Sequence, residues 1–490
     1  MRDLLTDPAW RPEDLGAPLP DSRHAVSVAI PAWQDVVDYE EGHPRIAAAF
    51  RCGYPRFFLH PRVQELFTAA EKKWAKPGEC ALVFPTTAAA QRCPEFVEQR
   101  STAKVRLVED AWLLGAAAVL LPQEDYKIAR LFWRYCGDTL SSRMAEAILQ
   151  ERPKPANHAD SDQTIRMRLA ALNGVSADDV FLYPSGMGAV AALHRALRAI
   201  HPRRPSAQLD FPYVDVLKVQ EEYGGAKFFP VADDASISEL NLLAASKEIS
   251  GVFCEMPSNP LLRCVRLSHF APVLRDNGVL LFIDDTIAGV TNIDALKFAD
   301  AVTTSLTKSF SGGGDVLAGA VTLNPRSPHH AALQRQLLAE SPARSLLWYE
   351  DAGALERNSR DFPARNERMS ATAAALVCLL EQHPAVEAVY YPRDGDGFEE
   401  IARPGAGRGC LFSFVLKDPA KAPAVYDRLQ VCKGPSLGTN FTLCCPYTLL
   451  AHYTELDWAA RCGVRADLLR VSAGLEPLED LVARFVRALS

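Results

Sequence analysis

Lys308 is the residue around which a chemical function can be argued from the sequence. It closes the stretch 300–308, DAVTTSLTK, in which an apolar run predicts a buried strand and Ser305 and Thr307 supply two hydroxyls just before the lysine. An amine held at a strand end can form a Schiff base with an aldehyde, and neighbouring hydroxyls can bind phosphate. The stretch therefore suits a cofactor that carries both groups. An ordinary loop lysine is the alternative.

Two more groups lie where open parallel sheets bind ligands, beyond the carboxyl ends of strands. The turn SGMG at 185–188 separates a predicted strand from a predicted helix at 189–200, and its glycines let backbone N–H groups approach an anion. Asp284 follows four apolar residues, and a carboxylate buried there needs a positive partner, such as a protonated pyridine nitrogen. A turn that serves only packing and an aspartate that caps the next turn are the alternatives.

An anion-binding helix start, a buried acid and a strand-end lysine thus follow one another along the chain. A Walker-type phosphate loop is excluded, because the glycines at 312–314 follow Lys308 instead of preceding it. Together the three features indicate pyridoxal 5'-phosphate as the cofactor.

The elements that must position these groups alternate between strands and helices. Apolar runs predict strands at 180–183, 227–231, 251–255, 279–283 and 301–306, with a return strand at 318–323. Helical segments separate most of them, which favours an α/β fold with a mainly parallel sheet and helices on both faces. Farther along the chain, long helices at 329–384, strands at 386–391 and 410–416 and a helix at 478–489 predict a smaller α+β domain.

A chain of 490 residues is too long for one core. We expect an N-terminal extension at 1–130, a large cofactor-binding domain at 131–326 and a small C-terminal domain at 327–490. In the extension, the alternating pattern of side chains at 25–30 predicts a strand. The stretch GYPRFF at 53–58 predicts a turn followed by apolar residues.

Composition excludes several other classes of function. The net charge is -7 and no basic block occurs, which argues against nucleic acid as a partner. The apolar stretch 111–121 is too short to span a bilayer, and the first residues lack the features of a signal peptide. The 12 cysteines form no Cys-x-x-Cys pair, so we expect a reduced, cytoplasmic protein without a metal site.

On these residues the chain resembles the Cys/Met-metabolism family of pyridoxal-phosphate enzymes, and most closely its fungal cystathionine gamma-synthase branch. The motifs that carry the resemblance span roughly 130–490: YPSGM at 183–187, EMPSNP at 255–260, IDDT at 283–286, SLTK at 305–308, SLG at 436–438 and LRVSAGLE at 469–476. The region 18–62 resembles the fungal N-terminal extension, with AVSV at 25–28 and GYPRF at 53–57. The resemblance implies a large domain of the aspartate aminotransferase type, fold type I.

The resemblance also implies roles for individual residues. Lys308 would hold the cofactor and move protons, and Asp284 would hold the proton of the pyridine ring. The remaining expected contacts are Gly186, Met187, Ser305 and Thr307 at the phosphate, Tyr213 stacked on the ring, Asn259 at its phenolic oxygen, and Arg470 with Ser436 at the substrate carboxylate. The structural alternatives are a core aromatic for Tyr213, a turn residue for Asn259, and ion pairing with Glu476 or Asp467 for Arg470.

One position departs from the family pattern. The family's Tyr-x-Arg motif reaches into the neighbouring subunit's site, and here Phe132 stands in the tyrosine position. Arg134 can still contact a phosphate across an interface, but the tyrosine hydroxyl is missing unless Tyr135 replaces it. A site shared in this way needs at least a homodimer, and a homotetramer is the other possibility.

The activity that the resemblance implies is γ-replacement on an O-acyl-L-homoserine, in which L-cysteine adds at Cγ and gives cystathionine. Three alternatives stay open from the sequence. An amine or a carbon nucleophile could replace cysteine, as in fungal secondary metabolism; the enzyme could act as a cystathionine lyase; or the chain could be an inactive, cofactor-binding regulatory relative. The small-molecule partners expected in the active cases are amino acids.

Overall fold

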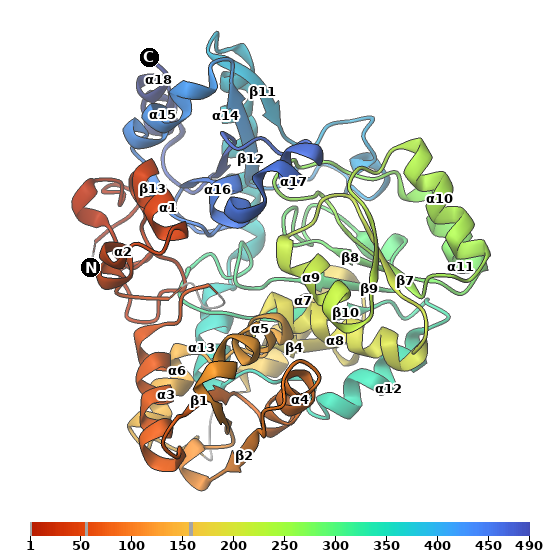
Figure 1. The fold of residues 1–490 in the computed structure, drawn as a ribbon. Helices are drawn as coiled ribbons and strands as arrows, with labels where there is room; N and C mark the ends of the chain where they lie inside the picture. Colours follow the sequence, from red (N-terminus) through yellow and green to blue (C-terminus); the bar gives the residue numbers. More distant parts are fainter. Residues whose placement is uncertain (1, 54–56, 156–159) are drawn as a thin grey trace.

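The computed structural model describes residues 2–53, 57–155 and 160–490. Within them, three sheets of seven, five and three strands form separate layers with their helices (Figure 1). The largest sheet belongs to the middle of the chain and lies between the N-terminal three-stranded sheet and the C-terminal five-stranded sheet.

The seven-stranded sheet has the order β4-β10-β9-β8-β7-β5-β6. Its strands run parallel from β9 to β6, and β10 is antiparallel to both of its neighbours. The strands are β4 (Val180–Tyr183), β5 (Ser206–Leu209), β6 (Ala226–Phe229), β7 (Gly251–Glu255), β8 (Leu280–Asp284), β9 (Ala301–Thr304) and β10 (Gly319–Leu323). The mainly parallel sheet is therefore confirmed, and each strand predicted between 180 and 323 is present. Strand β5 was not predicted.

Alternate side chains of the central strands face opposite layers of helices. Phe253 and Phe282 pack with α8, α9 and α12 on one face, whereas Val252 and Leu281 pack with α10 and α11 on the other. These helices are α8 (Gly186–Ile200), α9 (Val214–Tyr223), α10 (Asp234–Ala245), α11 (Ala271–Asp276) and α12 (His330–Glu340). Both faces are covered, as an apolar sheet of parallel strands requires.

The C-terminal domain is built on the sheet β11-β12-β15-β14-β13, antiparallel except for its last pair. Its strands are β11 (Val386–Tyr390), β12 (Leu411–Leu416), β13 (Cys432–Lys433), β14 (Leu443–Pro446) and β15 (Leu469–Ser472). Helices α14 (Phe362–Gln382), α15 (Ala422–Arg428) and α18 (Leu478–Leu489) contribute side chains to its core. The smaller α+β domain predicted from the sequence is confirmed.

Residues 2–53 extend this C-terminal domain (Figure 1). Their helices α1 (Trp33–Glu40) and α2 (Pro44–Ala49) bury Val36 and Ile46 in the same apolar cluster as α14, α15 and α18. The Ile30 N–H donates to the carbonyl of Lys433 at 3.0 Å, and the Tyr426 hydroxyl donates to the Ile30 carbonyl at 2.6 Å. The N-terminal segment is therefore part of the C-terminal core.

The strand predicted at 25–30 is wrong. The stretch forms one isolated bridge, between Pro18 and Val28, and is otherwise extended without a ladder. Proline has no backbone N–H to donate to a strand ladder. Pro18 is the bridge partner of Val28, and Pro20 and Pro31 lie on either side of the stretch in sequence. The alternating apolar residues pack against the C-terminal domain instead. Of the predicted turn at 53–58, residues 54–56 lie outside the described residues.

Residues 61–122 form a small module of their own in the lower part of Figure 1. It contains α3 (Pro61–Trp74), β1 (Glu79–Phe84), α4 (Thr87–Glu98), β2 (Arg106–Glu109) and β3 (Ala117–Pro122), with sheet order β1-β3-β2. The apolar stretch at 111–121 runs into the buried central strand β3 of this sheet. None of the helices in the described part of the chain combines the length and apolar character needed to cross a membrane.

Helices α5 (Tyr126–Cys136) and α6 (Ser142–Leu149) follow this module and share its core. Trp133 of α5 is buried, and its Nε1–H donates to the carbonyl of Val83 in β1 at 3.4 Å. The glycine that ends α5, Gly137, has φ of +70° and touches the backbone at the start of α8. This contact brings the module next to the turn that was predicted to bind an anion.

The role of residues 2–53 can be tested with Ile46→Ala. Ile46 is 1% exposed and lies in the C-terminal core, so the substitution removes buried methyl and methylene groups from that domain. We expect the free energy of unfolding to fall by about 2–5 kcal/mol in chemical denaturation. Leu242→Ala, at a side chain that is 70% exposed, is the control and should change stability by less than about 0.5 kcal/mol. Equal effects of the two substitutions would show that residues 2–53 are dispensable for the core.

Candidate active site

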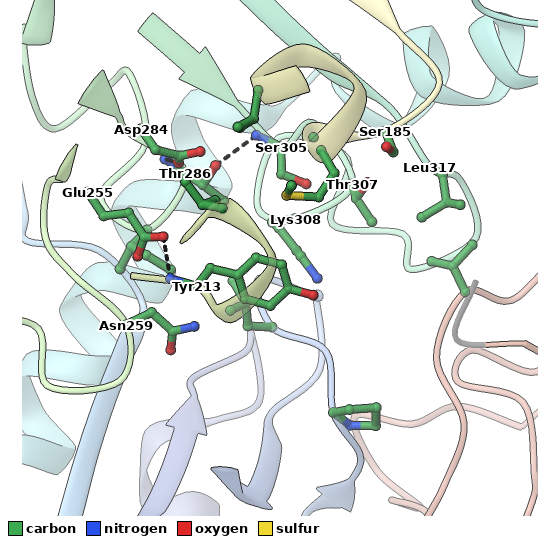
Figure 2. Close-up of a pocket in the computed structure, with 18 of the residues that line it drawn as sticks. Ser185, Tyr213, Glu255, Asn259, Asp284, Thr286, Ser305, Thr307, Lys308 and Leu317 are labelled. Carbon is green, nitrogen blue, oxygen red and sulfur yellow. Dashed lines mark hydrogen bonds between the residues drawn. The ribbon is translucent and has the colours of Figure 1, made fainter. Parts of the chain in front are cut away.

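One cavity collects most of the residues predicted from the sequence (Figure 2). It lies at the carboxyl ends of β7 and β8, beside the start of α8 and below the turn after β9. The predicted residues that line it are Gly186, Met187, Tyr213, Asn259, Asp284, Ser305, Thr307, Lys308 and Arg470. Two predicted site residues, Ser436 and Arg134, do not line the cavity, but Ser436 contacts Lys308, which does.

Lys308 lies in the turn that follows β9, and its amine points into the cavity (Figure 2). The Nζ donates to the Ser436 hydroxyl at 3.2 Å. Ser436 reaches it because Gly438, with φ of +70°, packs directly on the turn: a Cβ at Gly438 would lie 2.4 Å from the Ser309 nitrogen. A loop of the C-terminal domain therefore fixes the position of the amine.

The start of α8 and the turn before Lys308 touch at Gly186. A Cβ on Gly186 would lie 2.7 Å from the Ser305 Cβ, so only glycine allows this approach. Ser185 caps the helix by accepting from the Gly188 N–H at 3.0 Å and donates to the Gly137 carbonyl at 2.5 Å. Backbone N–H groups at a helix start form an anion site, so Gly186 and Met187 could hold a phosphate here.

The two hydroxyls next to Lys308 have different surroundings. Ser305 lies against Gly186, and its backbone N–H donates to the Thr286 hydroxyl at 2.7 Å, a contact that Figure 2 marks. The Thr307 hydroxyl is tied to Ala318, accepting from its N–H at 3.1 Å and donating to its carbonyl at 3.2 Å. Ser305 is therefore the better placed of the two to contact a phosphate, while Thr307 also joins the turn to β10.

Two carboxylates lie side by side at the strand ends. Asp284 accepts from the Thr286 N–H at 2.9 Å and the Thr303 hydroxyl at 3.0 Å, and burial raises its pKa. Glu255 is its register partner in β7, and burial, with the Asp284 charge, raises the pKa of Glu255 well above its ordinary value. A protonated pyridine nitrogen would give Asp284 a positively charged partner, so the two carboxylates fit a site for pyridoxal phosphate.

Glu255 was not singled out from the sequence, although it stands in the quoted motif at 255–260. Its carboxylate accepts from the Tyr213 N–H at 2.6 Å and thereby fixes the start of α9 (Figure 2). The Tyr213 ring points into the cavity beside the Lys308 amine. The signal that could have found Glu255 is the one that found Asp284, an acid at the end of an apolar strand.

Arg470 is 4% exposed and is held from both domains. Its Nη1 donates to the Asn259 Oδ1 at 3.1 Å, and its Nη2 donates to the carbonyls of Pro435 at 2.7 Å and Ser436 at 3.3 Å. Its guanidinium also lies 4.6 Å from the ring centre of Tyr447. The ion pairs with Glu476 or Asp467 considered from the sequence are not formed, since Glu476 binds Thr442 and Asp467 binds Arg465.

Arg134 is bound elsewhere in its own chain. It forms an ion pair with the fully buried Asp215 at 2.8 Å, and its guanidinium lies 4.5 Å from the ring centre of Phe57. Phe132 is buried between Phe84 and Phe96, so the residue in the tyrosine position is part of the core. The homodimer or homotetramer with shared sites stays a prediction.

Several lining residues were not predicted as site residues, and three of them are Val26, Phe57 and Thr139. All three come from before residue 160, so the N-terminal part of the chain contributes to the wall of its own site. Within the described residues, His, Cys, Asp and Glu side chains form no group of three or more that could hold a metal ion.

A mostly parallel sheet, a lysine in the turn after β9 and a half-buried acid ending β8 define a pyridoxal-phosphate-dependent enzyme of fold type I. Residues 159–490 match the family described as Cys/Met metabolism PLP-dependent enzyme, and residues 62–141 match the N-terminal domain of the fungal trans-sulfuration enzyme. The chain therefore belongs to the Cys/Met-metabolism family of pyridoxal-phosphate enzymes.

Individual relatives cover nearly the whole chain. The cystathionine gamma-synthase of Neurospora crassa is 32% identical over 98% of this chain and 98% of its own. The cystathionine gamma-synthase-like enzyme iboG2 of Amanita muscaria is 31% identical over 97% of this chain and 96% of its own. A solved structure of Xanthomonas oryzae pv. oryzae cystathionine gamma synthase in complex with aminoacrylate and cysteine has a TM-score of 0.57 at 25% identity, covering 68% of this chain and 85% of that one. The predicted fold and cofactor are confirmed.

Asp284 and Asp285 provide a matched pair for testing the acid at the strand end. Asp285 is buried and Asp284 is half-buried, and of the two only Asp284 lines the cavity. We expect Asp284→Asn to lower kcat/KM by about 10²–10³-fold, because it removes the charge that faces the cofactor ring. Asp285→Asn should lower it far less. Steady-state kinetics of the two holoenzymes would measure this, and an equal loss in both would contradict a specific role for Asp284.

Asp285 itself gives a prediction about pH. Burial raises its pKa from an ordinary 3.8 to about 7, although the Thr304 hydroxyl donates to it. The folded state therefore binds more protons than the unfolded state between these values, and stability falls as pH rises through this window. Asp285→Asn removes this loss. Thermal unfolding from pH 5 to pH 8 should show a smaller decline for Asp285→Asn than for the native chain, and parallel declines would contradict the assignment.

Proposed function

We propose that this enzyme catalyses γ-replacement on an O-acyl-L-homoserine and that it accepts L-cysteine as the nucleophile, giving cystathionine. The observation that carries the proposal is that Ser436 contacts both the amine of Lys308 and the guanidinium of Arg470. The Ser436 hydroxyl accepts from Lys308 at 3.2 Å and its carbonyl accepts from Arg470 at 3.3 Å. An amine that can move protons and a guanidinium that can grip a carboxylate are thus held next to each other.

Bound pyridoxal phosphate supplies an electron sink for the charge that develops at the substrate Cα. In this proposal Arg470 holds the substrate α-carboxylate and Asn259 keeps the guanidinium in place through its 3.1 Å contact. Lys308 takes the proton from Cα and then serves the proton transfer at Cβ. Asp284 keeps the ring nitrogen protonated, and Tyr213, fixed by Glu255, stacks on the ring.

The phosphate is assigned to the backbone N–H groups of Gly186 and Met187 and to the Ser305 hydroxyl, with Thr307 behind them. In the overall reaction the Cγ–O bond of the ester breaks and its carboxylate leaves. The cysteine sulfur forms a bond to Cγ and gives up its proton, so a carboxylic acid and cystathionine are the two products.

A second nucleophile is favoured by a specific observation. The wall of the site that comes from residues 26, 57 and 139 includes two apolar side chains, Val26 and Phe57, and no charged one among the described residues. A nucleophile with an apolar group is therefore the second candidate, and amines and carbon nucleophiles belong in the test.

The test is product identification by mass spectrometry, with O-acetyl- or O-succinyl-L-homoserine and a panel of cysteine, sulfide, amines and small ketones. We expect release of the free acid and a product in which the nucleophile is joined to Cγ. Lys308→Ala should lower the rate by roughly 10²–10⁴-fold or more, because it removes the proton-transfer amine. Lys227→Ala, at an exposed lysine on β6, is the control and should retain activity.

Two outcomes would contradict the proposal. Release of 2-oxobutanoate with no product from any nucleophile would indicate a lyase. A holoenzyme that holds the cofactor but releases no acid from either ester would indicate an inactive relative.

A further inference from the structure

A second cavity opens beside the active site, with a volume of about 40 Å³ against about 120 Å³ for the main one. Phe57, Tyr213, Pro435 and Arg470 line both cavities, so the two adjoin along these four residues. We call the second cavity the side chamber. Its own lining residues are Val28, Ile30, Tyr39, Phe50, Cys445, Tyr447, Leu450 and Ala451.

The side chamber is mostly apolar and lies where the N-terminal segment packs against the C-terminal domain. One wall comes from Val28, Ile30, Tyr39, Phe50 and Phe57, and the rings of Tyr39 and Phe50 stack with centres 5.6 Å apart. The opposite wall comes from β14 and from α16 (Tyr447–His452). Figure 1 shows α1 and α16 close together at this junction, and α1 and α16 are in contact.

Arg470 is the one charged side chain among the described residues of the side chamber. It already donates to Asn259, Pro435 and Ser436, and the proposed function gives it the carboxylate of the homoserine substrate. A second amino acid such as cysteine brings another carboxylate and an ammonium group, and burying either without a partner is costly. A hydrocarbon group meets no such cost here.

We propose that the side chamber binds the hydrocarbon group of the second substrate, so that the preferred nucleophile carries a short apolar chain. This inference rests on the proposed γ-replacement and deepens it by naming the class of nucleophile. With a thiol R–SH, the sulfur forms a bond to Cγ, the Cγ–O bond breaks, and the thiol proton leaves with the carboxylate as the free acid. The product is the S-alkyl homocysteine.

The size of the side chamber sets the length of the chain. A volume of roughly 10–15 Å³ on this measure holds one water-sized group, so about 40 Å³ holds about three carbons. Each buried methylene contributes about 0.8 kcal/mol, which corresponds to roughly fourfold in kcat/KM. Reactivity should therefore rise with chain length and then level off.

The experiment uses the holoenzyme, saturating O-acetyl-L-homoserine and a series of methane-, ethane-, propane- and pentanethiol together with L-cysteine. Keeping sulfur as the nucleophilic atom isolates the contribution of the chain. We expect kcat/KM to rise roughly fourfold per carbon up to propanethiol, to gain little beyond it, and to exceed the value for cysteine at propanethiol. A flat series, or cysteine as the best thiol, would overturn the proposal.

Variants connect the effect to the side chamber. Ala451→Phe fills it from α16 and should lower the ratio of kcat/KM for propanethiol to that for methanethiol from roughly 16-fold to about one. Ala460→Phe, at an exposed alanine of α17 (Leu456–Arg461), is the matched control and should leave this ratio unchanged. Val28→Ala enlarges the side chamber and should move the plateau to a longer chain. Val28→Ala provides the test if Ala451→Phe fails to fold. An unchanged plateau in Val28→Ala would then contradict the proposal.

Acetate release separates this inference from the proposed function. If no thiol gives acetate above the level without enzyme, γ-replacement itself is wrong. If acetate and thioether form but chain length has no effect, only the side chamber assignment is wrong. If Ala451→Phe changes the KM for O-acetyl-L-homoserine instead of the thiol ratio, the side chamber holds the acyl group and the proposal is overturned.

Discussion

The closeness of two carboxylates at neighbouring strand ends, one buried and one half-buried, is the constraint on which the rest of the site depends. Asp284 and Glu255 are register partners in β8 and β7, and burial raises the pKa of each. Two like charges cannot both be ionised cheaply in such a place, so the pair needs a cation or a proton. Glu255 accepts from the Tyr213 N–H, and Asp284 accepts from the Thr286 N–H and the Thr303 hydroxyl, so none of the three donors is charged. The position of the lysine, the glycine turn and Tyr213 around this pair then specifies the cofactor.

The site is also where the parts of the chain meet. The large domain supplies the acids, the anion-binding helix start and Lys308, whereas the C-terminal domain supplies Ser436 and Arg470. Residues 2–53 pack into the C-terminal core and reach the cavity through Val26. A disturbance of the N-terminal segment should therefore reach the substrate side of the site before it reaches the cofactor side, because the acids and Lys308 are held by the seven-stranded sheet and its turns.

The large domain could be predicted because its strands are local and apolar. The stretch 251–255 became β7 with the expected bounds, and the final helix 478–489 is α18. Strand β5 could not be predicted, because Ser206–Leu209 lacks the β-branched and aromatic residues typical of strands and is set by its neighbours β6 and β7. The contact of Arg134 with Asp215 joins residues 81 positions apart, and sequence spacing carries no information about such a pair.

The two walls of the active site differ in a way that bears on specificity. The cofactor wall is polar, and its residues constrain one another through Ser436, Glu255 and the strand register. The side chamber wall is mostly apolar and comes from the N-terminal segment on one side and from β14 and α16 on the other. An apolar side chain there can be exchanged for another of similar volume at little cost in stability. Substitutions there leave Lys308 and Asp284 in place, because neither residue lines the side chamber. Because the two walls are built by different parts of the chain, the apolar wall can vary in sequence while the polar wall around Lys308 keeps its residues.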